Sequence, residues 1–260
     1  MPKQLLIYEK VAAVSKERHA SWSVKSGNNY SFASAINSVP LMAVEFPRAA
    51  NEYTIVFTGD KDSNSIMPAA ILGVRNNENL YLSEAGDWKV DYVPAFLRCY
   101  PFVFSSGDEG NTLVLCIDEE FEGCNQEGRG ERLFDADGEQ TQYLKGILEF
   151  LKQYQAVFRR TQIFCEKLNK LDLLEPMQAS LTFKSGEKIS LGGFMAINRD
   201  KLKKLSGDQL AELVALDEME LIYLHLQSIQ NFAEMAKNIT QSVSGLDAQE
   251  EPLPIAASEA

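Results

Sequence analysis

Residues 140–171 read QTQYLKGILEFLKQYQAVFRRTQIFCEKLNKL, and this stretch separates two parts of the chain that have different patterns. Its apolar residues recur at steps of three and four, which is the spacing of one face of an α-helix. They are Leu144, Ile147, Leu148, Leu151, Tyr154, Phe158, Cys165, Leu168 and Leu171. We therefore expect one long amphipathic helix, which ends before Leu174-Glu175-Pro176 because proline lacks the N–H that a helix needs.

The part before this helix, residues 1–138, has the pattern of a β-rich region. Short apolar runs alternate there with clusters of glycine, asparagine, aspartate and serine, which favour turns. Prolines lie at the ends of several runs, where a strand tolerates them. The predicted strands are Leu41–Phe46, Tyr53–Thr58, Ala69–Val74, Asn79–Leu82 and Thr112–Ile117.

The part after residue 138 is predicted to be mainly helical up to residue 240. A hairpin over 177–193, with its turn at Lys184–Glu187, interrupts the helices. The predicted C-terminal helices are Asp200–Leu205, a helix capped by Ser206 that runs to about Leu216, and Asp217–Thr240. Residues 241–260 are small, acidic and proline-containing, which predicts a disordered tail. Strands followed by helices favour an α+β fold, and we expect residues 1–240 to form one domain.

The charge balance limits the classes of partner. The 260 residues include 25 Lys and Arg against 37 Asp and Glu, a net charge of −12. This disfavours a nucleic-acid-binding protein, which needs clustered basic residues. No apolar run reaches the roughly 18–20 residues of a membrane span, and the run Leu5–Tyr8 is too short for a signal peptide. Four separated cysteines without a C-x-x-C pair indicate reduced thiols, so we expect a cytoplasmic protein.

Few catalytic motifs are available in this sequence. It has two histidines: His19 lies in a polar segment and is predicted at the surface, whereas His225 lies in an apolar helix and is predicted in the core. Phosphate-binding glycine loops are absent, and the Asp135–Glu139 segment fits a turn better than a calcium loop. The carboxylates of Asp118–Glu120 fit a solvated strand end. We therefore predict no metal, no cofactor and no assigned catalytic residue.

The most unusual stretch is Trp88–Phe104, where six aromatic residues surround Arg98. A guanidinium group binds carboxylates with two parallel hydrogen bonds, and aromatic rings supply contact area, so the stretch suggests a recognition site. The alternative is a core arginine that is paired internally or that lies over aromatic rings. The candidate ligand-binding residues are Arg75, Trp88, Tyr92, Arg98, Tyr100 and His225.

Several ordered motifs give the chain a resemblance to the bacterial SapC family. They are Pro40-Leu41 with Glu45-Phe46-Pro47, Leu72-Gly73-Val74-Arg75, Tyr92–Arg98 with Tyr100-Pro101-Phe102, Leu115–Asp118, Leu133–Asp135, Leu173–Pro176, Gly192–Phe194, and Leu221–His225 with Ser228 and Asn231. The resemblance covers about residues 1–240. It implies a role linked to a surface layer, or a partner such as a flavin-dependent halogenase-like or cupin-like protein, and it supplies no catalytic residues.

Three hypotheses about function follow. The first is a non-enzymatic cytoplasmic accessory or binding protein that recognises a peptide, a protein or an anionic small molecule. The second is a structural component associated with a surface layer. The third is a metal-independent enzyme that uses carboxylates, tyrosine or His225, which requires His225 to contact a carboxylate in a pocket near the aromatic cluster.

Overall fold

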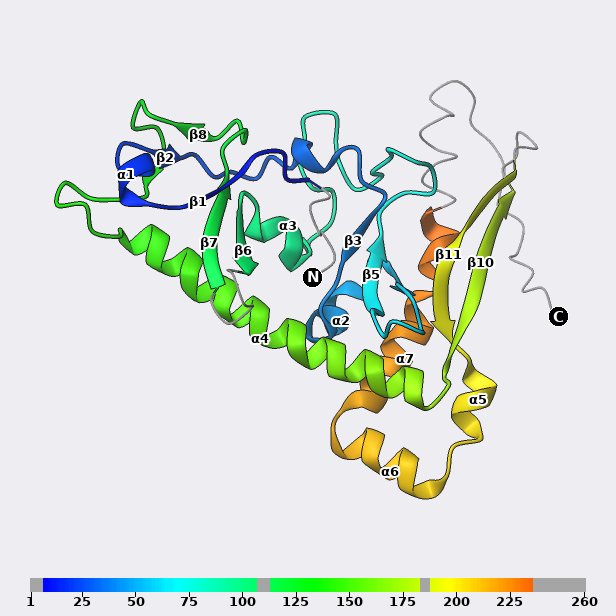
Figure 1. Cartoon of the computed structure of the whole chain (residues 1–260). Helices are drawn as coiled ribbons and strands as arrows, with labels where there is room; N and C mark the ends of the chain where they lie inside the picture. Colours follow the sequence, from blue (N-terminus) through cyan, green and yellow to red (C-terminus); the bar gives the residue numbers. More distant parts are fainter. Residues whose placement is uncertain (1–6, 107–112, 183–187, 236–260) are drawn as a thin grey trace.

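The computed structural model describes residues 7–106, 113–182 and 188–235, and it has the mixed α+β architecture that the sequence predicts (Figure 1). The strands and helices before the long central helix are β1 Val11–Ala13, α1 Lys16–His19, β2 Ser23–Val24, β3 Ser38–Pro40, α2 Phe46–Ala49, β4 Thr54–Thr58, β5 Met67–Ile71, α3 Ala95–Cys99, β6 Phe102–Ser106, β7 Leu113–Asp118, β8 Cys124–Asn125 and β9 Glu131–Arg132. Two short 3₁₀ turns, η1 Ser31–Ala33 and η2 Ala43–Glu45, lie among them. The central helix is α4 Gln142–Lys170, and it is followed by β10 Leu174–Thr182, β11 Lys188–Ile197, α5 Arg199–Lys203, α6 Gly207–Ala215 and α7 Glu218–Ser228.

The strands form three antiparallel sheets within the described ranges. The largest has the order β10-β11-β4-β5-β3, and the other two have the orders β1-β7-β6 and β8-β2-β9. The strands β4 and β5 pair over five residues, from Thr54 opposite Ile71 to Thr58 opposite Met67. By contrast, β11 and β4 share a single registered pair, Met195 with Phe57. Strand pairing therefore contributes little to the junction between the β10-β11 half of the large sheet and its β4-β5-β3 half.

The helix α4 connects two hydrophobic cores. It begins where the Thr141 side chain accepts a hydrogen bond from the Leu144 N–H, and it runs along one edge of the molecule (Figure 1). Leu144 and Leu151, in its first half, pack into a core with residues of β6 and β7. Phe164 and Leu168, in its second half, pack into a core formed with β3, β4 and β5. One amphipathic face of α4 thus packs against both hydrophobic cores.

Two of the predicted strands are wrong. Leu41–Phe46 is replaced by η2 and the start of α2, because Pro47 lies in the first turn of α2, where a missing N–H costs nothing. Asn79–Leu82 forms no strand, and Leu82 makes only an isolated bridge with Trp88. The third predicted C-terminal helix ends early, since α7 stops at Ser228 and helical structure resumes at 231–235.

The other predicted elements hold where the structure describes them. The long helix, the hairpin, the short helix after Asn198 and the helix capped by Ser206 are confirmed. The predicted hairpin turn at Lys184–Glu187 and the predicted tail at 241–260 lie outside the described residues. Across the described ranges, no helix combines the length and the apolar character needed to cross a bilayer.

Candidate functional site

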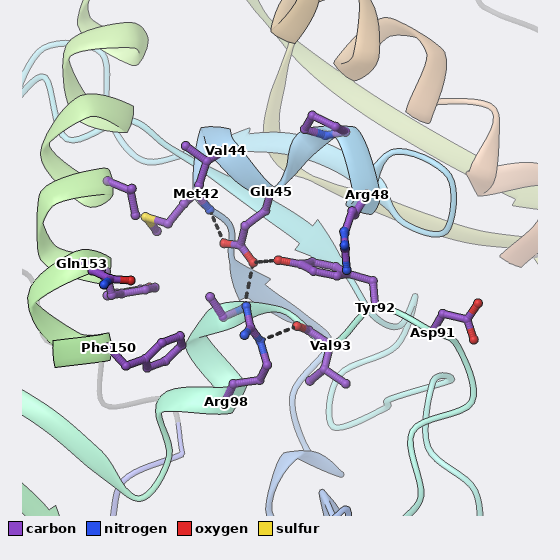
Figure 2. A pocket seen from close by; sticks show the side chains of 14 residues that line it. Met42, Val44, Glu45, Arg48, Asp91, Tyr92, Val93, Arg98, Phe150 and Gln153 are labelled. Carbon is purple, nitrogen blue, oxygen red and sulfur yellow. Dashed lines mark hydrogen bonds between the residues drawn. The ribbon is translucent and has the colours of Figure 1, made fainter. Parts of the chain in front are cut away.

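A hollow of about 610 Å³ lies between η2 and α2 on one side, α3 on another and α4 on the third (Figure 2). This volume is within the range of about 300–1,000 Å³ that small-molecule sites occupy. The lining is mostly apolar, with charged groups from three segments. It consists of Met42, Val44, Glu45, Pro47, Arg48, Asp91, Tyr92, Val93, Ala95, Arg98, Phe150, Gln153, Tyr154 and Val157.

Glu45 fixes the shape of the hollow. Its carboxylate is 5% exposed and accepts three hydrogen bonds of 2.7 Å, from the Tyr92 hydroxyl, the Ala95 N–H and the Met42 N–H. Burial raises its pKa, while these hydrogen bonds and the nearby Arg98 guanidinium act in the opposite direction. Because each bond reaches a different segment, Glu45 joins η2, the Tyr92 loop and the start of α3. We interpret it as a structural residue.

Arg98 presents its guanidinium group at the hollow. The Nε–H donates to the Val93 carbonyl at 3.0 Å, and Cζ lies 5.9 Å from the centroid of the Tyr92 ring and 5.3 Å from that of Phe150. These distances are those of cation–π contacts. The side chain is exposed, and its charge also acts on the Tyr92 hydroxyl and on the buried Glu45 carboxylate, where it opposes the rise in pKa that burial causes. The Val93 carbonyl and the two aromatic rings therefore hold Arg98 in place where it lines the hollow.

A second arginine, Arg48 of α2, lines the same hollow and is also exposed. No ion pair joins it to any residue in 7–106, 113–182 or 188–235. Asp91 is an exposed carboxylate among the lining residues. The charged groups of the site are thus two arginines, the exposed Asp91 and the buried, hydrogen-bonded Glu45, and they lie beside an apolar wall.

Among the residues that the sequence singles out, Tyr92 and Arg98 lie together in the hollow. Trp88 lies elsewhere: its indole N–H donates to the Tyr53 hydroxyl at 2.7 Å, and its ring stacks on Tyr81. Tyr100 stacks on Phe32, and its hydroxyl donates to Asp118 at 3.2 Å. Both side chains are thus engaged in packing and hydrogen bonds within the fold.

Arg75 and His225 are also placed outside the hollow. Arg75 donates to the Glu78 carboxylate at 3.0 Å in a turn after β5. His225 is fully buried; its Nδ1–H donates to the Ile55 carbonyl at 2.9 Å, and its Nε2 accepts from the Ile197 N–H at 3.0 Å. The imidazole therefore bridges β4 and β11 where their own pairing is limited to one residue pair. The expected core position of His225 is confirmed.

His225 belongs to a row of polar side chains on one face of the C-terminal helical segment. The Ser228 hydroxyl accepts from the Ile55 N–H at 3.0 Å, and the Asn231 amide donates to the carbonyls of Ala50 and Tyr53 at 2.9 and 2.8 Å. All three side chains bind backbone groups in or just before β4. They replace the hydrogen bonds that a neighbouring strand would supply.

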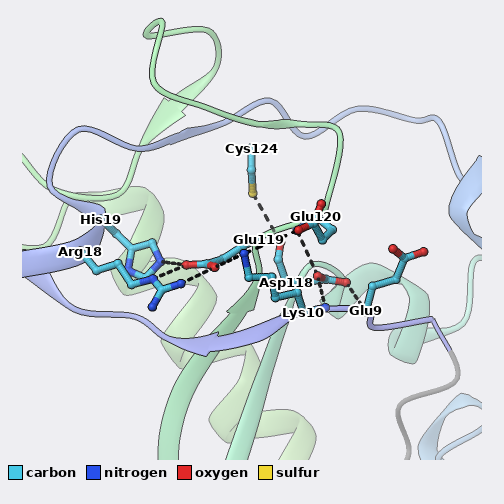
Figure 3. Close-up of polar contacts among 8 residues, drawn as sticks. All are labelled: Glu9, Lys10, Arg18, His19, Asp118, Glu119, Glu120 and Cys124. Atoms are coloured by element: carbon cyan, nitrogen blue, oxygen red, sulfur yellow. Dashed lines mark hydrogen bonds and ion pairs between the residues drawn. The ribbon is translucent and has the colours of Figure 1, made fainter.

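The second cluster of ionisable groups lies at the end of β7 (Figure 3). Asp118 is fully buried, and it accepts from the N–H groups of Glu9, Lys10 and Glu120 at 2.8, 2.9 and 3.2 Å and from Tyr100. The solvated strand end expected for Asp118 is therefore wrong: its carboxylate terminates a buried strand and holds the N-terminal segment.

The predicted surface position of His19 is also wrong, because the side chain has no exposed area. Its Nδ1 accepts from the Ser15 N–H at 3.2 Å, so Nε2 carries the proton and donates to Glu119 at 3.2 Å. Arg18 binds the same carboxylate through two nitrogens. These contacts lower the pKa of Glu119, Arg18 being the main cause. Both imidazole nitrogens are used in the fold.

Sequence reasoning missed Arg48, Glu45 and Phe150 as components of the site. Phe150 lies three residues after Ile147 and four before Tyr154, so it continues the spacing of the apolar residues of α4, which is the signal that could have identified it. Glu45 falls inside the predicted strand Leu41–Phe46, and no prediction covers Arg48. No group of three or more His, Cys, Asp or Glu side chains in the described residues is arranged to hold a metal ion.

Comparison with known proteins gives one match. A search of curated proteins finds none, and a search of solved structures finds none either. The SapC family model matches residues 14–235 of the 260, a range that contains the hollow, Arg48 and Arg98, and the polar residues His225, Ser228 and Asn231. Since this match spans most of the chain, the protein belongs to the SapC family.

Proposed function

We propose that this protein is a binding protein that takes an anionic ligand with an apolar body into the hollow between α2, α3 and α4. The observation that carries the proposal is the state of Arg98. Its Nε–H and its face are held by Val93, Tyr92 and Phe150, and its exposed guanidinium group lines the hollow. A preorganised guanidinium group of this kind suits a carboxylate, because less side-chain entropy is lost on binding.

The surrounding surface supports a ligand that is not purely ionic. Met42, Val157 and Phe150 provide an apolar wall, and Arg48 adds a second positive charge. The ligand class is therefore a carboxylate on an aliphatic or aromatic body, either as a small molecule or as part of a peptide or protein. A cytoplasmic location and an accessory role beside a second protein belong to the same proposal.

Catalysis is less well supported by the same geometry. The enzyme hypothesis requires His225 to contact a carboxylate near the aromatic cluster, whereas both of its nitrogens bind backbone groups. Burial lowers the pKa of His225 to about 4, and the environment is closed to solvent. The surface-layer hypothesis gains no specific observation, so we retain ligand binding as the function.

The test is a binding titration with octanoate, phenylpropionate and their uncharged amides, followed by calorimetry. We expect the carboxylates to bind more tightly than the amides. Arg98→Ala should weaken carboxylate binding by about tenfold or more, since a charged hydrogen bond contributes about 1.5–3 kcal/mol. Arg98→Lys keeps the charge and should recover only part of the affinity.

The matched control is Arg199→Ala, which removes an exposed arginine next to Asn198 in α5, a helix that does not line the hollow. It should leave affinity unchanged. Equal affinity for carboxylates and amides would contradict the proposal, as would the same loss in the Arg98 and Arg199 variants. Thermal unfolding of each variant checks that the fold is retained.

A further inference from the structure

The outer face of α4 is basic, although the protein carries a net charge of −12. Lys145, Lys152 and Arg159 are exposed and follow one another at intervals of seven residues. Seven residues correspond to nearly two turns, so the three side chains lie along one line, about 10.5 Å apart. Arg160 is exposed beside them, and Glu149 is the only carboxylate that α4 carries between Lys145 and Arg160.

These basic side chains are not neutralised by the fold. In the part of the chain that the structure describes, none of the four forms an ion pair. The C-terminal end of the same helix behaves differently, since Lys167 pairs with Glu212 and Glu218 at 2.8 and 2.7 Å. Glu149 accepts a hydrogen bond from the Gln153 amide. The unpaired charges are therefore concentrated on the part of α4 that faces away from both cores.

Small and apolar residues lie among these charges. Ala156 is exposed, and Ile163 keeps 61% of its surface exposed. Both residues share the side of the helix that carries Lys145, Lys152 and Arg159, since Ala156 lies four residues after Lys152 and Ile163 four residues after Arg159.

We propose that the outer face of α4 docks an acidic helix of a partner protein. Carboxylates at seven-residue spacing on that helix would lie opposite Lys145, Lys152 and Arg159, and its apolar residues would contact Ala156 and Ile163. Equal spacing on both helices is the pattern by which charged flanks of paired helices select a partner. This surface is separate from the hollow, so the inference does not rest on the proposed ligand.

The experiment measures fluorescence anisotropy of a labelled helical peptide with the full chain. The probe has three heptad repeats, each with glutamate at two positions and leucine at one, and a second probe has glutamine in place of every glutamate. We expect saturable binding of the glutamate probe and none of the glutamine probe. K152E/R159E should weaken binding by about tenfold or more, because each reversed charge faces a carboxylate.

The matched control is K203E/K204E, which makes the same change of net charge at two exposed lysines at the end of α5. It should change affinity by less than about twofold at moderate salt. If the double variant fails to fold, the single variants K152Q and R159Q allow the same measurement, because each changes one exposed side chain. Each should weaken binding by about threefold.

Three results would overturn the inference. The first is equal weakening by K152E/R159E and K203E/K204E, which would show that the peptide senses only net charge. The second is the absence of saturable binding by the wild-type chain up to about 1 mM peptide, the weak end of specific affinities. The third is tighter binding of single-stranded DNA or of phosphatidylserine vesicles than of the glutamate probe.

Discussion

Acidification should destabilise this protein through His225, and the expected size follows from the structure. The neutral imidazole donates to the Ile55 carbonyl and accepts from the Ile197 N–H, so a proton on Nε2 would break the second bond. It would also place an unpaired charge in a fully buried position. Desolvation accordingly lowers the pKa of His225 in the folded chain to about 4, against an ordinary value of 6.5.

The direction of the effect depends on which state binds the proton first. With a pKa lower in the folded chain, the unfolded chain takes up a proton as the pH falls below about 6.5, and the folded chain does not do so until about pH 4. The contribution to the free energy of unfolding is therefore complete above pH 6.5 and is lost as the pH falls towards 4. A difference of about 2.5 pH units corresponds to a loss of about 3 kcal/mol.

The assay is equilibrium unfolding in urea at several pH values between 7.5 and 4.5, for the wild-type chain and for His225→Asn. The variant should be less stable by about 1–3 kcal/mol at pH 7.5, because one backbone group loses its partner. It should also lose less stability on acidification, since residue 225 no longer titrates. The free-energy difference between the two proteins should therefore shrink as the pH falls.

Parallel pH profiles for the two proteins would refute this reasoning. If His225→Asn does not fold, imidazole NMR provides an independent measurement. His19 is the other histidine of the chain, so His19→Gln leaves one imidazole signal to follow. That signal should stay in its neutral form to below pH 5. A titration midpoint near 6.5 in the folded chain would contradict the buried, backbone-bound imidazole.

Two further predictions concern buried oxygen atoms. The Tyr154 hydroxyl is buried without a hydrogen-bond partner in the described residues, so Tyr154→Phe should leave the free energy of unfolding unchanged or raise it by about 1 kcal/mol. Tyr53→Phe is the matched control, because the Tyr53 hydroxyl binds an indole N–H and a backbone carbonyl. Thermal unfolding should show that this variant loses about 1–2 kcal/mol of the free energy of unfolding. Equal effects of the two substitutions would contradict the assignment of the Tyr154 hydroxyl as unpaired within the described residues. Asp118→Asn should lower the free energy of unfolding in urea by about 3 kcal/mol, because an amide cannot accept from all three backbone N–H groups. A loss below about 0.5 kcal/mol would show that these hydrogen bonds contribute little.

The sequence predicts the parts of the fold that local patterns determine. Residues 140–171 carry the three- and four-residue spacing except for one step of seven between Phe158 and Cys165, and α4 occupies Gln142–Lys170. Ser206 accepts from the Gln209 N–H as a helix cap, as its position before an apolar segment indicates. The strand predicted at Leu41–Phe46 fails because an apolar run of that length is compatible with a buried turn as well as with a strand.

Only part of the candidate site could be predicted from the sequence, because the hollow is formed by segments that are far apart in the chain. Arg98 and Tyr92 are six residues apart and share a segment, so their proximity could be predicted. Arg48 and Phe150 reach the hollow from elements far apart in the chain, and nothing in their local sequence specifies that approach. Trp88 and Tyr100 belong to the same aromatic stretch, yet their side chains form hydrogen bonds inside the fold and do not line the hollow.

The same comparison shows why buried polar residues here indicate structure more than chemistry. His19, Glu45, Asp118 and His225 are the kinds of residue that catalysis uses, and all four are almost completely buried. Each forms its hydrogen bonds with backbone N–H or carbonyl groups or with a side chain that is itself held in the fold. Such groups replace missing sheet or helix hydrogen bonds between segments that pair poorly, as His225 does between β4 and β11. Arg98 is the opposite case: it is exposed and its Nε–H is held by the Val93 carbonyl, so the proposed ligand would meet a guanidinium group that the fold has already positioned.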